Sequence, residues 1–319
     1  MPCPQNYYPC YTSAAAAAAS AASIDDGSYA GFATHYLHSS VLSDLEARLA
    51  ELVFPDSMSL DERWGIVNDT IEEFSTGLPP GEAPVLAGPL RAAIDRCFRN
   101  ETVEDILDAL GREETLVDWA SKAADTLRAR SPTALRVTLR QLRTGRSWTI
   151  AEAFQREHVI ASHFMRHPDF IEGVTKLLLP PAQGGKGKGS GEGSGEGSGG
   201  TAAEPDKPVW DPATLDLTPE QTAIDFLHPP DGSECLALLK PGAGTYADDY
   251  PHAHRFGLPR ERAVRDLIAR TPMAASAAVD WFVLQYRGKD GVRAKVRDVL
   301  ARCTVTDANT GFAIWDRTD

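Results

Sequence analysis

The chain has 319 residues, of which 42% are hydrophobic and 24% charged, and its formal net charge is −13 at pH 7. This length suffices for one large domain or two small ones. The acidic total disfavours general binding to nucleic acids or anionic membranes, although it is compatible with a local basic stripe. No run reaches the roughly 20 apolar residues that a membrane-spanning helix needs.

The cysteines and the N-terminal residues point to no processing or metal-binding pattern. The five cysteines are far apart and lack CxxC spacing, so we expect free thiols in a reducing compartment. The first 47 residues contain no Lys or Arg, whereas signal and mitochondrial transit peptides carry basic residues. We therefore see no targeting signal in this chain and expect residues 1–30 to be a low-complexity leader.

Residues 31–182 are typical of a series of amphipathic helices. Apolar residues recur every three or four positions, as in helices with one buried face. Ser131 followed by Pro132, and the T-x-x-E box of Thr149 and Glu152, predict two helix starts, and Asp169 is predicted to cap the last helix. The predicted helices lie near residues 42–52, 60–74, 90–98, 103–111, 116–127, 132–145, 149–166 and 170–179.

The remaining residues divide into a linker and a helical extension. Residues 183–209 include "GGKGKGSGEGSGEGSGG", a Gly/Ser-rich tract that we expect to be a disordered linker. Residues 210–319 are predicted to form a C-terminal extension with three helices and a short strand at "GFAIW". No βαβ series and no phosphate-binding G-x-G-x-x-G after a strand is found. The sequence therefore predicts a mainly α protein.

The sequence offers no catalytic or metal-binding constellation. His158, His163 and His167 are separated by five and four residues, so one helical face does not hold all three, and solvated or core histidines are expected. His252 and His254, in a predicted loop, are interpreted in the same way. A G-x-S-x-G nucleophile elbow in a strand–turn–helix context is missing, since "GSGEGSG" only repeats glycine and serine within the linker, and H-E-x-x-H is missing too. We predict no catalytic residue, no metal and no cofactor.

One group of charges is less ordinary. Arg136, Arg140 and Arg143 stand at i, i+4 and i+7 of one predicted helix, and Arg146 extends the stripe. The common interpretation is a solvated face whose arginines pair with carboxylates. The functional interpretation is an anion partner, either the phosphates of a nucleotide-bearing ligand or an RNA backbone. The sequence leaves both open.

Five segments, in this order, resemble the C-terminal half of the 3-hydroxyisobutyryl-CoA hydrolases of the crotonase (enoyl-CoA hydratase/isomerase) superfamily. They are "GFATHYLHSSVLSDLEARL", "CFRNETVEDILDAL", "SPTALRVTLRQLRTG", "HPDFIEGVTKLLL" and "PVWDPATLDL". The third and fourth are the most specific, and the resemblance covers about residues 31–217. The tail from about Asp225 resembles extensions of fungal members. The resemblance implies a mitochondrial hydrolase that cleaves a CoA thioester in valine catabolism.

In that family the oxyanion hole and the acidic catalytic groups lie in an α/β half that precedes the "GFATH" segment. The resemblance therefore implies the helical C-terminal half of a crotonase-type fold without its β-rich core, a truncated chain lacking its own catalytic residues. Lys176 stands where relatives bring a basic and an aromatic residue to the CoA adenine. The aromatic residue is missing, so we assign no substrate-binding residue. Helices that normally lie against the β-rich core would expose their apolar faces without it, and we expect such faces to self-associate.

Two further interpretations remain. Some fungal relatives of this family belong to the small subunit of the mitochondrial ribosome, so the chain is alternatively a non-catalytic ribosomal component whose arginine stripe meets RNA or protein. The third interpretation is a helical interaction module unrelated to thioesters. A membrane partner is expected in none of the three.

Overall fold

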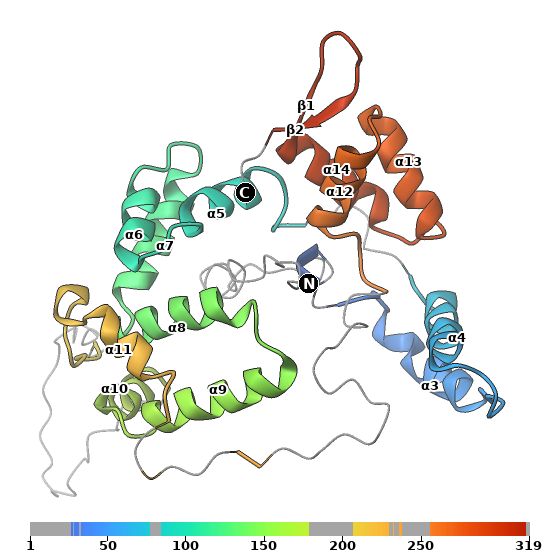
Figure 1. Cartoon of the computed structure of the whole chain (residues 1–319). Helices are drawn as coiled ribbons and strands as arrows, with labels where there is room; N and C mark the ends of the chain where they lie inside the picture. Colours follow the sequence, from blue (N-terminus) through green and yellow to red (C-terminus); the bar gives the residue numbers. More distant parts are fainter. Residues whose placement is uncertain are drawn as a thin grey trace, which may run out of the picture. The chain divides into compact units, whose positions relative to one another are not determined.

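The computed structural model describes residues 27, 29–31, 33–76, 84–178, 207–229, 232, 236–237 and 256–316. These residues are mainly helical and contain one two-stranded sheet (Figure 1), which confirms the predicted mainly α class. Most of the predicted leader and almost all of the predicted Gly/Ser linker lie outside the described residues; of the leader, residues 27, 29 and 30 are described, and Tyr29 and Ala30 are buried. The chain divides into two compact units, one formed by Met1–Thr126 with Lys240–Asp319 and the other by Leu127–Leu239. These limits differ from the boundaries expected at residues 182 and 209.

Between residues 33 and 128, the described part of the chain contains the short η1 and the helices α3 to α7, close to the predicted positions. α6 begins as expected, because Thr102 Oγ1 accepts a hydrogen bond from Asp105 N at 3.1 Å. α4 begins with a capping box of Ser59 and Glu62, which fixes its first turn. The bounds are η1 (Ser39–Val41), α3 (Leu42–Ala50), α4 (Leu60–Glu73), α5 (Gly88–Phe98), α6 (Val103–Gly111) and α7 (Val117–Arg128).

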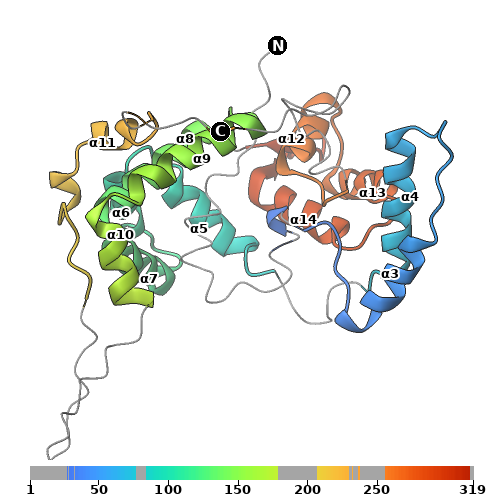
Figure 2. The same ribbon diagram turned by 90° about the horizontal axis from the view of Figure 1, so that it is seen from below.

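The C-terminal part of the first unit confirms the three tail helices and the terminal strand. They are α12 (Glu261–Arg270), α13 (Ala275–Gln285) and α14 (Val292–Cys303), followed by β1 (Thr304–Thr306) and β2 (Ala313–Trp315). The strands pair antiparallel, with Val305 opposite Ile314. α13 lies beside α14 in both views (Figures 1 and 2). The buried side chains of these elements form one apolar core that includes Val264, Ile268, Phe282, Val296, Val299 and Leu300.

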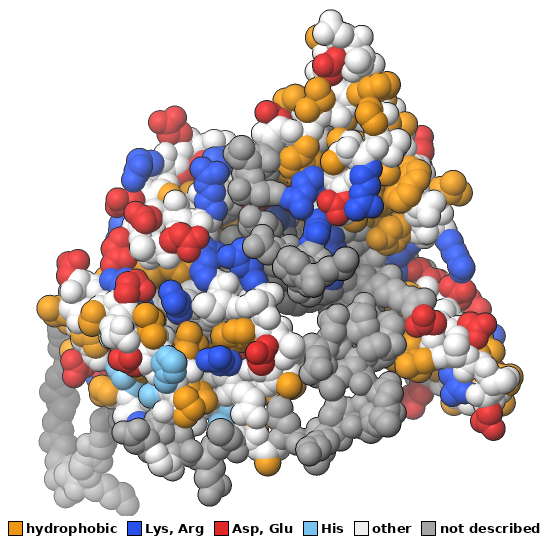
Figure 3. Space-filling model, viewed as in Figure 1, with side chains coloured by type: hydrophobic (Ala, Val, Ile, Leu, Met, Phe, Trp, Pro, Cys, Tyr) orange, Lys and Arg blue, Asp and Glu red, His pale blue; other side chains and the backbone are white. Residues whose placement is uncertain are grey.

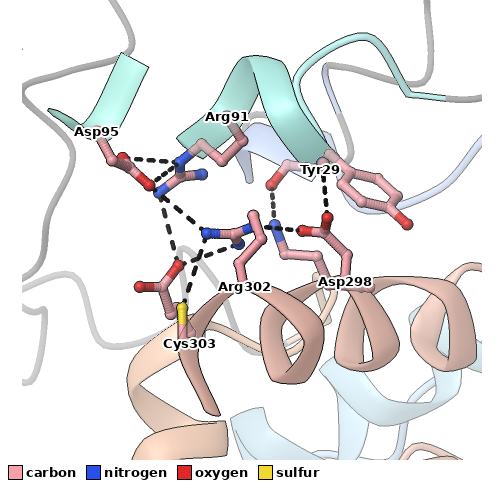
Figure 4. Close-up of polar contacts among 9 residues, drawn as sticks. Tyr29, Arg91, Asp95, Asp298, Arg302 and Cys303 are labelled. Carbon is pink, nitrogen blue, oxygen red and sulfur yellow. Dashed lines mark hydrogen bonds and ion pairs between the residues drawn. The ribbon is translucent and has the colours of Figure 1, made fainter. Parts of the chain in front are cut away.

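A buried group of charges joins α5 to α12 and α14 (Figure 4). Arg302 is the centre: its guanidinium donates to Asp298 Oδ2 at 3.0 Å and to Glu261 Oε2 at 3.3 Å, and lies 3.5 Å from Asp95 Oδ2. Arg91 Nε bonds the same Asp95 at 2.9 Å. Arg302 and Asp95 have only 7% and 9% of their side chains exposed. Charges this deep in a protein persist only when they are paired.

The same charges hold the backbone of segments far apart in the sequence. Asp298 Oδ1 accepts from Gly88 N at 2.7 Å, and Lys295 Nζ donates to the carbonyl oxygen of Tyr29 at 2.9 Å. The described residues 256–316 are therefore packed on Tyr29 and α5, whereas residues 207–229 belong to the other unit. Helical periodicity could not show this, because it does not reveal which charges find partners far along the chain.

The second unit is built from α8 (Pro132–Gly145), α9 (Ile150–Phe164), α10 (Pro168–Gly173) with the π-helical turn η2 (Val174–Leu178), η3 (Leu215–Leu217) and α11 (Glu220–Asp225). Its core comprises Val137, Ile160, Ala223, Phe226 and Leu227. The capping box of α9 is confirmed, because Thr149 and Glu152 exchange both expected bonds. The predicted cap of α10 is wrong: His167 accepts from Asp169 N at 3.3 Å, and the Asp169 side chain bonds elsewhere. The six-residue α11 was not predicted.

Candidate functional site

The three motifs of the second unit meet at the carboxylate of Asp169. Asp169 Oδ2 accepts from Ser131 Oγ at 2.5 Å, and Oδ1 accepts from Asp211 N at 2.8 Å. Asp169 is only 6% exposed. Ser131 begins "SPTALR", Asp169 lies in "HPDFIEGV" and Asp211 lies in "PVWDPATLDL". Segments separated by up to 80 positions are therefore joined by one side chain.

Contacts around Asp169 fasten the "PVW" segment on both sides. Trp210 Nε1 donates to the carbonyl oxygen of Ala129 at 3.2 Å, and Val209 N donates to Glu172 Oε1 at 2.9 Å. A Cβ atom at Gly173 would lie 3.5 Å from the Trp210 ring, so the indole packs directly on this glycine. Residues 209–211 thus bridge the residues before α8 and the helix α10.

Ser131, Asp169 and His167 lie together but are not arranged for nucleophilic catalysis. In a catalytic triad the histidine stands between the hydroxyl and the carboxylate. Here Ser131 donates directly to Asp169, and its oxygen accepts from Ala134 N at 3.1 Å as the N-cap of α8. His167 Nδ1 is 3.8 Å from Asp169 Oδ2. The Ser131 hydroxyl therefore uses both its donor and its acceptor within the fold, and these three residues have a structural role.

The histidines predicted to be core or solvated residues fall mainly in an aromatic contact with α11. His163 stacks on Phe226 with ring centroids 4.8 Å apart, and its Nε2 is 2.8 Å from the carbonyl oxygen of His228. His167 lies 5.9 Å from the Phe226 ring. In the described part of the chain, no group of three or more His, Cys, Asp or Glu residues could hold a metal ion. His252 and His254 lie outside the described residues.

The predicted arginine stripe divides into two parts with different surroundings. Arg136 is 8% exposed, forms an ion pair with Glu220, and donates from Nη2 to the carbonyl oxygen of Leu215 at 3.1 Å. This arginine holds η3 and α11 against α8, so the structural interpretation is right for it. One to three turns further, Arg140 and Arg146 are exposed and Arg143 is half-buried.

We name Arg140, Arg143 and Arg146 the basic face of α8. It lies at the C-terminal end of the helix, where Arg146 Nε donates to the carbonyl oxygen of Arg143 at 3.2 Å. Figure 3 shows Lys and Arg side chains, in blue, over the region of α8. Positive charges are favourable near a helix C-terminus, and they leave an exposed cationic surface. This surface is the candidate functional site of the second unit.

No single helix among the described residues is long and apolar enough to span a membrane. Only α12 and α13 taken together have that length and hydropathy, and they are bent by 120° with respect to each other.

The fold resembles a crotonase. A carnitinyl-CoA dehydratase from Mycobacterium thermoresistibile superposes with a TM-score of 0.50 at 23% identity, covering 70% of this chain and 55% of that one. A sequence model described as enoyl-CoA hydratase/isomerase matches residues 12–183, which is more than half of the chain. The chain belongs to this family, as its motifs predicted.

The individual relatives fall into two groups. Small ribosomal subunit protein mS47 of Neurospora crassa is 39% identical over 297 residues, which are 91% of this chain and 54% of that protein. The mS47 protein of Schizosaccharomyces pombe is 32% identical over 49% of this chain and 35% of its own length. The mitochondrial 3-hydroxyisobutyryl-CoA hydrolase of Danio rerio is 32% identical over 50% of this chain and 39% of that enzyme. The chain thus spans about half the length, or less, of the curated relatives it matches.

Proposed function

We propose that this chain is a non-catalytic component of the small subunit of the mitochondrial ribosome, and hence a mitochondrial protein. The observation that carries the proposal is the 39% identity to the Neurospora crassa mS47 protein over 91% of this chain. An alignment of 297 residues necessarily extends well beyond the crotonase match at residues 12–183. The Danio rerio hydrolase, in contrast, aligns with only 50% of the chain.

The fold gives this long similarity a physical meaning. Residues 256–316 carry α12 to α14, and their charges are buried against Arg91 and Asp95 of α5. Since these charges need one another, the C-terminal helices and α5 are parts of the same packed unit. The similarity to mS47 therefore extends over an integral part of the fold and not over an appended tail.

The surface of α13 supports membership of a larger assembly. Its inner side buries Ala278, Val279 and Phe282, while on its outer side Trp281 and Leu284 are 40% and 75% exposed. Large apolar side chains that are exposed close together on one helix are typical of a surface that a partner covers. Within a ribosomal subunit this outer side would lie against a neighbour.

Sedimentation of the full chain tests the proposal. We expect an epitope-tagged chain, expressed in its own cells, to migrate with the mitochondrial small subunit in sucrose gradients. It should stay with that subunit, and not with the large one, when magnesium is removed to separate the two. A chain found only at the top of the gradient would contradict the proposal, and a tagged soluble matrix protein serves as control.

A second candidate is hydrolysis of a CoA thioester, as in valine catabolism, favoured by the 32% identity to the Danio rerio hydrolase. This chemistry requires an oxyanion hole and positioned acid or base groups, and we assign none of these roles to a described residue. Release of free thiol from 3-hydroxyisobutyryl-CoA by the purified chain would distinguish the candidates. Turnover above that of a heat-denatured sample would favour the hydrolase.

A further inference from the structure

The exposed side of α13 carries a stripe of apolar residues. Ala277, Trp281 and Leu284 stand at i, i+4 and i+7 of this helix, and all three are exposed. The exposed fractions are 40% for Trp281 and 75% for Leu284, and Figure 3 shows hydrophobic side chains, in orange, gathered over α13. Steps of four and three residues place these positions along one line, as in the seam between two packed helices. We name these three residues the apolar stripe of α13.

The charges beside the apolar stripe are few and balanced. Asp280 is the one charged residue of α13, and Arg293 Nη1 lies 3.0 Å from its Oδ1. Arg287, just beyond the helix, lies 3.1 Å from Asp69 Oδ2. Each of these arginines therefore already faces a carboxylate. Binding to RNA phosphates depends on cations, whereas an apolar centre with a polar rim is typical of a protein interface. The charge around the stripe thus favours a protein partner over RNA.

The helix that carries the apolar stripe is fixed in the fold before any partner binds. The other side of α13 buries Ala278, Val279 and Phe282 in the core of the tail helices. The Trp281 ring lies edge-on to Phe282, with ring centroids 4.9 Å apart. A side chain that is already positioned loses little conformational entropy on binding. Tryptophan is also enriched among the few residues that dominate the binding energy of protein interfaces.

The size of the apolar stripe argues against a second copy of this chain as the partner. At their exposed fractions, Trp281 and Leu284 offer about 200 Å² between them, whereas a stable interface takes about 800 Å² from each protein. Two copies that met along α13 would also bring no opposite charges together, since Asp280 is the single charge of this helix. A partner held at other points of the same assembly does not need the full area from one helix.

We propose that the apolar stripe of α13 packs against an amphipathic α-helix of another protein of the mitochondrial small subunit, with Trp281 at the centre of the contact. The small side chain of Ala277 lets the partner helix approach closely at one end of the stripe, and Leu284 fills the contact at the other. The inference rests on the proposed function for the assembly, and on the exposure, spacing and charge of α13 for the chemistry of the partner.

The test compares two variants of the full chain, epitope-tagged and expressed in its own cells. W281S/L284S removes the large residues of the stripe, and V305S/I314S removes an exposed cross-strand pair from the β1–β2 sheet of the same unit. In sucrose gradients, the ratio of subunit-bound to free chain should fall about 30-fold or more for W281S/L284S, as expected when a central Trp is lost. The V305S/I314S control should match the wild type, and thermal melts confirm that both variants are folded.

A photo-reactive benzoylphenylalanine in place of Leu284 identifies the partner directly. On irradiation of the cells it should give one main cross-linked product, which protease removes and RNase does not. Mass spectrometry should identify the partner as a protein of the small subunit, joined through a residue of one of its helices. A cross-link to RNA, a cross-link to a second copy of this chain, or the lack of any product would overturn the inference.

The outcomes separate this inference from the proposed function. If the wild type sediments with the small subunit and W281S/L284S does so equally well, the inference fails and the proposed function stands. An equal loss in W281S/L284S and V305S/I314S also overturns the inference, because the loss then does not depend on α13. If the wild type stays at the top of the gradient, the proposed function fails, and a cross-link to a protein outside the ribosome then contradicts the partner named here as well.

Discussion

Replacing Arg302 by Met tests whether the buried charges hold the first unit together. The arginine is 7% exposed and contacts the carboxylates of Asp95, Glu261 and Asp298. In the wild type three cations (Arg91, Lys295, Arg302) face these three carboxylates, so the variant leaves one buried negative charge without compensation. Breaking a buried pair in this way costs about 3–5 kcal/mol. Arg91 still contacts Asp95 and Glu261, which places the expected cost near about 3 kcal/mol.

The loss is measured by urea unfolding, followed by far-ultraviolet circular dichroism. In a thermal melt of the same variant, a loss of about 3 kcal/mol corresponds to a fall in Tm of about 6–12 °C, at about 2–4 °C per kcal/mol. Arg297→Met on the exposed side of the same helix is the matched control and should change stability by at most about 0.5 kcal/mol. Hydrogen exchange should accelerate in α5 together with α14. A cost for R302M below about 1 kcal/mol, the value of a surface pair, would refute the reasoning.

Three further outcomes are expected. Asp169→Ala removes the acceptor of Ser131 Oγ and Asp211 N and should destabilise the second unit by about 2–5 kcal/mol in urea titrations; an unchanged midpoint would contradict this. Burial lowers the pKa of Lys295 from 10.5 to about 8. Between pH 8 and 10.5 the unfolded chain therefore binds more protons than the folded chain. The free energy of unfolding of the wild type, relative to that of Lys295→Met, should rise over this window by up to roughly 3 kcal/mol. If the free energies of unfolding of the two proteins change with pH in parallel, the prediction is contradicted. Burial raises the pKa of the Cys97 thiol to about 11, so mass spectrometry should find Cys97 and the buried Cys303 alkylated only after unfolding.

The helices and the family could be predicted because both depend on residues that are close together in the sequence. Ser131 with Pro132, and Thr149 with Glu152, form caps within three or four residues, so their geometry depends little on the rest of the chain. A short helix such as α11 has too few turns for periodicity to be visible. Its position is decided by Arg136 and Phe226, which pack against partners that are distant in the sequence.

The candidate site shows the same limit. The stripe of Arg136, Arg140 and Arg143 could be found from spacing, but spacing treats its members as equal. Glu220 and the Leu215 carbonyl, 84 and 79 positions away, show that Arg136 is structural. Asp169 was predicted as a helix cap, since Asp near a helix start commonly has this role. Its actual bonds to Ser131 and Asp211 depend on tertiary packing, and the only sequence signal for them was the family motif itself.

The contacts around Asp169 also explain how this family member tolerates its glycine-rich segment. Glu172 and Gly173 on one side, and Val209 to Asp211 on the other, are in direct contact. Both ends of the intervening chain are therefore fixed by these contacts. Its length need not affect how α10 packs against residues 209–211. For a flexible loop, each doubling of length costs only about 0.6 kcal/mol of closure entropy. Asp169 therefore makes this position a place where evolution can lengthen, shorten or rewrite the chain while the fold on either side stays the same.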